Sequence, residues 1–283
     1  MPELPEVETV RRTLEPLLVG RRVMRVDLRR ADIVEGDSSA GALLEGATIR
    51  SLVRRGKQLA IIAGGGGRKP DAGRVLVVHL GMTGQLVHHG ARVDVRSTTH
   101  VHALWEIGAD AGGDGGVLTF RDPRRFGGLW PLRDEGALRE RWGALGPDGL
   151  EITGDELRER AGGSRRAIKA ALLDQGVVAG VGNIYADESL FRAGVRPGRA
   201  CRGIRAGEWM RLAGSIREVL GAAILAGGST VRDYVGGTGE MGTAQRSHLV
   251  YGRGREACFG CGRTLRSTVV AQRTTVWCGT CQR

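Results

Sequence analysis

The first eight residues carry groups that could do covalent chemistry. They read Met-Pro-Glu-Leu-Pro-Glu-Val-Glu, and removal of Met1 would leave Pro2 as a free secondary amine. Such an amine can attack an aldehyde carbon and form an iminium ion, as lysine does in other covalent catalysts. Glu3 and Glu6 follow and could move protons. A plain helix start also fits, because proline and acidic residues are favoured in a first helical turn. The octapeptide alone leaves both interpretations open.

Four cysteines near the end of the chain have the spacing of metal ligands. Residues 262–277 separate two Cys-x-x-Cys pairs, which consist of Cys258, Cys261, Cys278 and Cys281. Four thiolates at this spacing can surround one Zn²⁺ tetrahedrally, with a redox dithiol as the alternative. The sequence therefore predicts a structural zinc site on a β-hairpin, with Cys201 as an ordinary thiol elsewhere. The hairpin also carries side chains that could enter a DNA groove or face solvent: Arg263, Arg266, Gln272 and Arg273.

A glycine-rich turn directly precedes a predicted helix. It reads Gly-Val-Gly-Asn-Ile-Tyr-Ala, with Asn183 and Tyr185 at the helix start. Backbone N–H groups at a helix N-terminus bind phosphate, although plain capping is the simpler interpretation of this motif alone. Arg165, Arg166 and Lys169 add positive charge ahead of the turn.

A second turn combines basic and aromatic side chains. The segment Asp-Pro-Arg-Arg-Phe-Gly would expose Arg124 and Arg125 beside Phe126. Arginine can read guanine edges or pair with a cytosine left without its partner, and an apolar side chain can wedge into a base step. Met82, in His-Leu-Gly-Met-Thr-Gly, is another apolar candidate for filling such a gap. Buried turn residues are the competing interpretation of both segments.

One lysine and two histidines have less specific surroundings. Lys57 is expected within a strand that continues to Ile62, where a surface lysine is the default. His100 and His102 are expected to point the same way from one strand. Two histidines without a third ligand make a weak metal site, so a phosphate contact or a surface role is favoured.

The elements that must position these groups change type near residue 133. Apolar residues at three-and-four spacing predict a helix over residues 5–19, which Gly20 ends. Short apolar runs predict strands of a mostly antiparallel β domain at 23–28, 49–62, 75–80, 101–107 and 117–120. Helical patterns follow at 136–144, 153–161, 165–175, 183–193 and 207–226. Glycine-rich loops are expected at 64–67, 108–116 and 236–242.

The composition favours a polyanionic partner. The 283 residues include 42 Lys and Arg against 31 Asp and Glu, a formal net charge of +11. Nucleic acid is the first candidate for such a partner and a membrane surface the second. The sequence has no long uncharged apolar run and no apolar signal core near Met1. A soluble, cytoplasmic protein without a membrane partner is therefore expected.

In its motifs and their order, the chain closely resembles the formamidopyrimidine-DNA glycosylase (Fpg) family of the Fpg/Nei superfamily. The resemblance spans the N-terminal octapeptide, the Lys57 segment, the two turns, the glycine-rich helix start and the cysteine hairpin. With leucine at position 4, the N-terminal motif resembles that of the Fpg branch rather than that of the Nei branch. The resemblance implies an α+β fold: an N-terminal β-sandwich with a leading helix (residues 1–134), a helix-two-turn-helix domain (135–244) and a zinc hairpin (245–283).

The resemblance also implies roles at the reacting nucleotide. Pro2 would attack C1′ and form the Schiff base, with Glu3 as the proton-transfer residue and Glu6 in support. Lys57 would act in base release and β-elimination. Arg273 would grip a phosphate and donate a proton in δ-elimination.

Further residues would contact double-stranded DNA that contains an oxidised base. Those implied to fill the hole left by the extruded base, to contact the orphaned cytosine or to hold the backbone are Met82, His100, Arg124, Arg125, Phe126, Arg165, Asn183 and Tyr185. One structural Zn²⁺, a monomeric state and a bacterial, nucleoid-associated location complete the expectation.

The implied activity is that of a bifunctional DNA glycosylase and AP lyase. It would release 8-oxoguanine or formamidopyrimidines and then cut the strand by β,δ-elimination. The loop over residues 237–244 aligns with the segment that closes over an extruded 8-oxoguanine, and Ala244 stands where relatives commonly have an aromatic residue. Two alternatives therefore stay open: the same chemistry on oxidised pyrimidines, as in the Nei branch, or a zinc-ribbon protein that binds DNA without cutting it.

Overall fold

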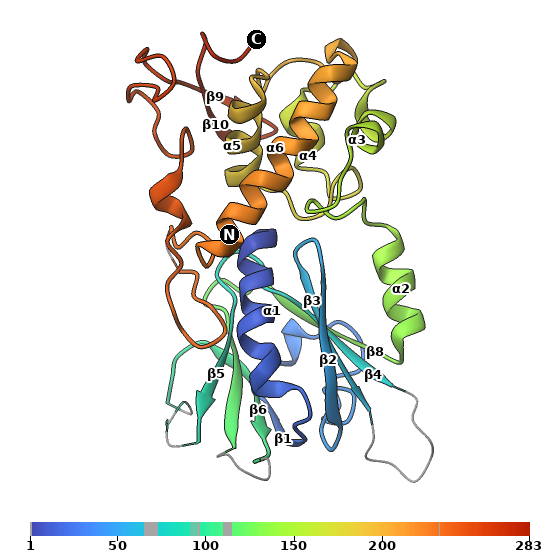
Figure 1. The fold of residues 1–283 in the computed structure, drawn as a ribbon. Coiled ribbons are helices and arrows are strands. Elements are labelled where there is room, and N and C mark those ends of the chain that lie inside the picture. Colours follow the sequence, from blue (N-terminus) through green and yellow to red (C-terminus); the bar gives the residue numbers. More distant parts are fainter. Residues whose placement is uncertain are drawn as a thin grey trace. The chain divides into compact units, whose positions relative to one another are not determined.

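The computed structural model describes residues 2–64, 73–91, 93, 95, 97–109, 115–231 and 233–283. The chain forms two compact units with an α+β fold, which confirms the predicted class (Figure 1). The first unit comprises Met1–Gly143 and Gly227–Gly242, and the second comprises Ala144–Ala226 and Thr243–Arg283.

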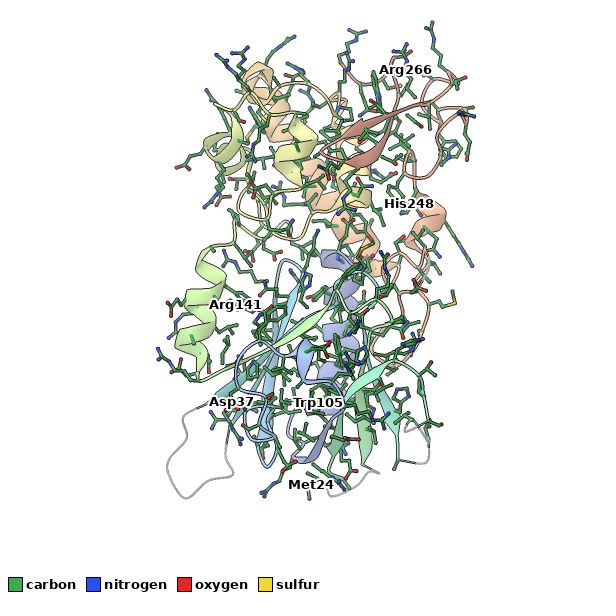
Figure 2. All side chains as sticks on the ribbon, turned by 180° about the vertical axis from the view of Figure 1, so that it is seen from behind. Met24, Asp37, Trp105, Arg141, His248 and Arg266 are labelled. Carbon is green, nitrogen blue, oxygen red and sulfur yellow. The ribbon has the colours of Figure 1, made fainter. Side chains whose placement is uncertain are left out.

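The first unit is a sandwich of two four-stranded antiparallel sheets. One sheet has the order β1-β6-β7-β5, with β1 (Val23–Leu28), β5 (Gln85–Gly90), β6 (Val101–Ile107) and β7 (Gly116–Arg121). The other has the order β2-β3-β4-β8, with β2 (Thr48–Arg55), β3 (Gln58–Gly64), β4 (Arg74–His79) and β8 (Gly128–Leu132). Because side chains alternate across a strand, Leu76 and Val78 of β4 share one core with Trp105 and Phe120 of the facing sheet. Trp105 lies inside this core, whereas Met24 projects from β1 into solvent (Figure 2).

Helix α1 (Leu4–Leu18) packs against the same core through apolar residues at helical spacing. Val7, Val10, Leu14 and Leu18 are at most 1% exposed. Two residues after the helix, glycine takes the left-handed φ of +83° without the penalty that a side chain would bring. The predicted N-terminal helix is confirmed to within one residue at each end.

Helix α2 (Glu135–Gly143) covers the outer face of the second sheet. Val75 and Val77 of β4 point away from the main core and form a smaller apolar cluster with Leu138 and Trp142. This packing places α2 in the first unit, whereas it was expected in the helical domain at residues 135–244.

The second unit is mainly helical and includes the cysteine hairpin. Its helices are α3 (Gly154–Ala161), α4 (Ile168–Leu172), α5 (Asn183–Ala193) and α6 (Ala206–Leu225), and its strands are β9 (Arg266–Val270) and β10 (Arg273–Trp277). Short 3₁₀ helices are η1 (Ala31–Ile33) in the first unit and η2 (Cys201–Gly203) and η3 (Ala244–Ser247) in the second. Helix α6 buries Leu212, Ile216 and Leu220 along one stripe, and α5 packs against both α6 and β10. The hairpin therefore groups with the helices.

Some predicted elements differ from the structure for local reasons. The strand expected over residues 49–62 is two strands, and the helix expected over 165–175 is limited to α4. Strands β5, which contains two adjacent histidines, and β8, which contains Pro131, were not predicted. The glycine-rich stretches at 64–67 and 108–116 lie partly outside the described residues. Among the residues that the structure describes, no helix is both long and apolar enough to cross a bilayer.

Candidate functional site

The start of the chain is fixed by hydrogen bonds at the N-terminus of α1. Pro2 and Glu3 are buried, and Glu3 is the N-cap residue, with extended backbone. The Glu3 backbone N–H donates to Glu6 Oε2 at 2.8 Å. This is one half of a capping box, which sets the direction in which the chain enters the helix. The structure thus brings together the proline and both acids that the sequence analysis singled out.

A second segment of the first unit holds Glu6 from the other side. The Ser229 N–H donates to Glu6 Oε1 at 2.7 Å, and the Tyr234 hydroxyl donates to the Glu6 backbone oxygen at 3.2 Å. Burial, together with the negative charge of Glu6, raises the pKa of Tyr234, so its hydroxyl stays protonated as a donor. Both carboxylate oxygens of Glu6 are engaged, which suits a positioning role.

No role was predicted for this second segment, which contains Ser229 and Tyr234. The sequence feature that could have indicated this segment is the pair Gly227-Gly228. Gly228 has a φ of +80°, and a Cβ on it would lie 3.2 Å from Glu6 Cγ. A glycine at 228 is what lets the segment approach Glu6 so closely.

Lys57 does not lie inside a strand, as expected, but in the turn between β2 and β3. Arg55 and Gln58 are directly paired, so Gly56 and Lys57 form the two-residue turn. Gly56 has a φ of +55°, which such tight hairpin turns require. Arg54 Nη1 donates to the Gly56 backbone oxygen at 3.1 Å. Lys57 is half-buried at the end of the sheet and does not lie on the face of a strand.

His79 is a candidate that the sequence analysis quoted in a motif but did not single out. It ends β4 beside Gln58, and its Nδ1 accepts from the Gly81 N–H at 3.2 Å. Burial lowers the pKa of His79, and the positive charges of Lys57 and Arg141 lower it further. The imidazole is therefore neutral at pH 7, with the proton assigned to Nε2, where it can donate to an anion.

The turn at residues 122–127 and the Met82 loop are joined by a buried acid. Asp122 is fully buried, and its Oδ1 accepts from the Thr83 hydroxyl at 2.5 Å, while Oδ2 accepts from the Gly127 N–H at 2.7 Å. Gly81 permits this approach, because a Cβ there would lie 2.3 Å from the Gly127 nitrogen. Met82 and the two arginines are therefore brought to one place.

Phe126 is presented to solvent by this turn, not buried in it. Its side chain is 56% exposed, and the Arg124 guanidinium carbon lies 4.8 Å from its ring centroid. Arg125 has a φ of +54° and pairs with Asp32 of η1 at 2.9 Å. The arginines and the aromatic ring thus form an exposed, positively charged tip.

The two histidines near residue 100 do not share a face, contrary to expectation. His100 is exposed and precedes β6 with a φ of +64°, whereas His102 is buried and its Nε2 lies 2.8 Å from the Asp122 backbone oxygen. The strand is bulged between Val101 and Ala103, which breaks the alternation on which the expectation rested.

In the second unit, α4 and α5 anchor the hairpin strand that carries Arg273. Asn183 Nδ2 donates to the Thr274 backbone oxygen at 3.2 Å. Lys169 is fully buried: its Nζ lies 2.7 Å from Asp187 Oδ1 and donates to Thr275 Oγ1 at 2.8 Å. Burial raises the pKa of Asp187, and the ion pair with Lys169 opposes that rise. Lys169 was expected to add positive charge ahead of the glycine-rich turn, but its charge is paired with Asp187 inside the unit.

The remaining candidates of the second unit have different environments. Arg165 is exposed ahead of α4, and Arg273 is exposed at the start of β10. Tyr185 is 1% exposed and points into the unit. Ala244 is also buried, and with Tyr185 and Val219 it lines a cavity of about 60 Å³. An aromatic side chain at position 244 would accordingly face this interior.

The four cysteines of the hairpin are arranged to hold a metal ion. Their sulfurs all lie within 4.8 Å of one another, with 3.9 Å between Cys258 and Cys281 and 3.5 Å between Cys261 and Cys278. A tetrahedron with Zn–S bonds of about 2.3 Å has sulfurs about 3.8 Å apart, so these residues fit zinc. Cys201, the fifth cysteine, is buried in η2.

Two sequence-family models match most of the chain. The formamidopyrimidine-DNA glycosylase N-terminal domain matches residues 1–129, and the formamidopyrimidine-DNA glycosylase H2TH domain matches residues 145–235. The formamidopyrimidine-DNA glycosylase of Xanthomonas euvesicatoria pv. vesicatoria is 44% identical over 287 residues, which cover 100% of both sequences. Fold and matches together define a protein of the DNA glycosylase class. More particularly, the chain belongs to the formamidopyrimidine-DNA glycosylase family.

Solved structures of the family share the fold over nearly the whole chain. MutM (Fpg) from Thermus thermophilus has a TM-score of 0.83 and 40% identity, and the match covers 99% of this chain and 98% of that one. Lactococcus lactis Fpg in complex with DNA containing an abasic site has a TM-score of 0.86 and 31% identity, with 99% of both chains covered. The wild-type Lactococcus lactis protein in complex with N7-benzyl-Fapy-dG DNA has a TM-score of 0.85 and 30% identity, with full coverage.

Proposed function

We propose that this protein is a bifunctional DNA glycosylase and AP lyase of base excision repair, which removes 8-oxoguanine and formamidopyrimidines. The observation that carries the proposal is the fixed start of α1, where Glu6 binds the backbone of Glu3 directly after the buried Pro2. A catalytic group gains most from being held in its reactive geometry before substrate arrives. Family membership and the DNA complexes of its relatives support the same conclusion.

In the proposed reaction, the unprotonated Pro2 nitrogen attacks C1′ of the damaged nucleotide. The glycosidic bond breaks, and the base leaves with a proton. Glu3 transfers a proton to O4′ as the sugar ring opens, which leaves an iminium between Pro2 and C1′. Loss of a C2′ proton then expels the 3′ phosphate, and a second elimination expels the 5′ phosphate. Water finally hydrolyses the iminium and regenerates the amine.

Other side chains are proposed to bind the DNA around this reaction. Lys57 acts in base release and β-elimination, and Arg273 with Asn183 holds a backbone phosphate. The damaged base must leave the stack, at a cost of a few kcal/mol. Met82 and Phe126 are proposed to occupy the gap left by the base. Both lie on the two loops that Asp122 joins, and Phe126 is exposed.

Arg124, Arg125, His100 and Arg165 are proposed as further DNA contacts, and their exposure supports this. Tyr185 is proposed to act from inside the unit, by supporting the Asn183 helix start. The four cysteines are proposed to hold one structural Zn²⁺. A cytoplasmic, nucleoid-associated monomer is proposed, and the bacterial origin of the relatives supports the cytoplasmic location.

Borohydride should trap a covalent complex between the protein lacking Met1 and a duplex containing 8-oxoguanine opposite cytosine. Reduction converts the iminium into a stable amine, so the complex survives denaturing electrophoresis. Pro2→Gly or retained Met1 should trap at least about tenfold less, because each replaces or displaces the prolyl amine. Pro5→Ala, in the same segment, should trap like the wild type. Equal trapping by Pro2→Gly would assign the nucleophile elsewhere.

A side-by-side cleavage assay separates the substrate classes. Duplexes with 8-oxoguanine, a formamidopyrimidine or thymine glycol should be cut in favour of the two purine lesions. Preference for thymine glycol would instead support the Nei-like alternative. Salt-sensitive binding without strand scission would support a DNA-binding protein that does not cut.

A further inference from the structure

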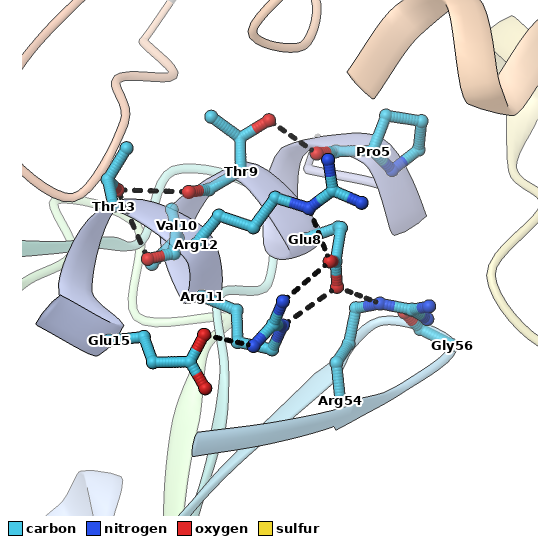
Figure 3. Close-up of polar contacts among 10 residues, drawn as sticks. All are labelled: Pro5, Glu8, Thr9, Val10, Arg11, Arg12, Thr13, Glu15, Arg54 and Gly56. Atoms are coloured by element: carbon cyan, nitrogen blue, oxygen red, sulfur yellow. Dashed lines mark hydrogen bonds and ion pairs between the residues drawn. The ribbon is translucent and has the colours of Figure 1, made fainter. Parts of the chain in front are cut away.

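A buried ion pair connects α1, which carries the proposed nucleophile, to the turn that carries Lys57. The Glu8 side chain is 8% exposed and that of Arg54 is 7% exposed, and Arg54 Nε donates to Glu8 Oε2 at 3.0 Å. The same guanidinium donates through Nη1 to the Gly56 backbone oxygen at 3.1 Å. One side chain thus spans from the helix to the residue directly before Lys57 (Figure 3).

Glu8 also binds two arginines of its own helix, but these contacts have a different character. Arg11 donates to both carboxylate oxygens, and Arg12 donates to Oε1 at 2.7 Å. Pairs three or four residues apart mainly stabilise the helix itself, by a few tenths of a kcal/mol each. Arg54 belongs to β2 instead, so its contact fixes the helix against the sheet.

Stability alone does not explain why Arg54 is a partner of Glu8. Removing two charges from water costs several kcal/mol per ion, and apolar residues of similar size often serve stability equally well. What an apolar pair cannot provide is direction: the planar guanidinium binds the carboxylate and the carbonyl at fixed angles. The pair is therefore suited to defining where the turn lies.

Both ends of this connection are themselves held in place. At the helix end, Glu6 fixes the backbone of Glu3, and Glu8 lies two residues further along the same rigid helix. At the turn end, Gln58 accepts from Trp142 Nε1 at 3.0 Å and from Arg141 Nε at 3.3 Å. The direct pairing of Arg55 with Gln58 leaves the turn only two residues long.

We propose that Glu8 and Arg54 are positioning residues that set the place of Lys57 relative to Pro2 and Glu3. This inference rests on the function proposed above. The pair touches neither substrate nor reacting atoms and acts only through the Lys57 turn. A displacement of about 1 Å in a catalytic group can slow a reaction by about a hundredfold.

Arg54→Lys is the sharpest variant for this proposal. Lysine keeps a positive charge beside Glu8, but its single ammonium group cannot reproduce the two directed bonds of the guanidinium. We expect a thermal midpoint close to that of the wild type, unchanged affinity for an uncleavable abasic analogue, and a single-turnover trapping rate about tenfold lower. Glu8→Gln, which keeps the shape and loses the charge, should slow trapping in the same way.

Glu15→Gln provides the matched control on the same helix. Glu15 binds Arg11 at 2.8 Å and is 44% exposed, so this change removes an ion pair without touching Arg54. It should trap at the wild-type rate. Equal slowing by Glu15→Gln and Arg54→Lys would overturn the proposal, because any lost pair on α1 would then have the same effect.

A double-mutant cycle with Lys57→Ala tests whether Arg54 acts through Lys57. If it does, Arg54→Lys should cause little further slowing once Lys57 is absent. Additive effects, or wild-type trapping by Arg54→Lys alone, would overturn the proposal while the glycosylase function stands. Absence of trapping by the wild-type protein would instead overturn the proposed function itself.

Discussion

The residues of the candidate site are of two kinds. Buried polar residues hold the loops in place, and the loops expose other side chains to solvent. Asp122 and Glu6 are almost fully buried, and each accepts hydrogen bonds from two separate segments. Buried polar groups must be satisfied, so each acid enforces the conformation of the loops that satisfy it. Phe126 and Arg124 are the groups so presented. Their exposure follows from the burial of Asp122.

Phe126→Ala should reduce DNA affinity without reducing stability. An exposed ring that stacks on bases contributes about 1–3 kcal/mol, so the Kd for lesion DNA should rise roughly 5- to 150-fold. The measurement is fluorescence anisotropy with an abasic-analogue duplex, together with a thermal midpoint. Met24→Ala removes a side chain of similar exposure from β1 and should change neither. A Phe126→Ala protein that binds as tightly as the wild type would exclude the proposed wedge role.

At the scale of elements, the cysteine hairpin contacts the helices through one of its two strands. The four thiols at the base of β9 and β10 are arranged to hold a metal ion, while Asn183, Lys169 and Asp187 bind the backbone of β10. Two residues with positive φ, Ala271 and Gln272, form the turn directly before Arg273. Such turns favour glycine or asparagine, so the tip is backbone that the rest of the hairpin has to hold in place.

Metal removal should therefore weaken the binding of DNA by the hairpin. The protein as purified should contain one zinc per chain by elemental analysis. Stripping it with a strong chelator, or Cys258→Ser, should lower the affinity for abasic DNA at least about tenfold, because the Arg273 strand loses one of its anchors. Cys201→Ser removes the fifth cysteine and should keep both zinc and affinity. Full affinity of the metal-free protein would contradict a structural role of the site.

Over the whole molecule, charge affects both the choice of binding partner and the pH range over which the folded state is stable. The net charge of +11 favours DNA as the partner. Because basic residues are in excess, several acids also lie beside arginines. Burial opposes ionisation of Glu8, but the hydrogen bonds from Arg11, Arg12 and Arg54 outweigh it and lower the pKa of Glu8 to about 2. Glu8 is thus a buried acid whose protonation should matter to the first unit.

Glu8 should make the folded state sensitive to acid. A carboxyl with a lowered pKa stabilises the folded state above its unfolded pKa of 4.5, and this contribution is lost as the pH falls from about 4.5 to about 2. The shift corresponds to at most about 3 kcal/mol, which solvent screening of the half-exposed Arg12 reduces. The free energy of unfolding of the wild type should exceed that of Glu8→Gln by up to this amount at pH 6, and the difference should close toward pH 2. A difference independent of pH, measured by urea unfolding, would exclude the ion pairs as its source.

Local patterns in the sequence determine most elements and the metal ligands. Strands β1 and β6 and helix α5 begin and end where periodicity predicts, because alternation and helical spacing are properties of short windows. The cysteine spacing likewise predicts a four-sulfur cluster, since each pair needs only its own tight turn. The predicted fold class and family are confirmed on this basis.

Only the tertiary structure decides how the site is assembled. The approach of Ser229 and Tyr234 to Glu6, the proximity of His79 to Lys57, and the link from Glu8 through Arg54 each join residues far apart in the chain. No local period encodes such contacts, because they depend on how helix and sheets pack. By itself the sequence determined which residue types are available for chemistry. Packing decided which of them are buried as supports and which are held where DNA can reach them.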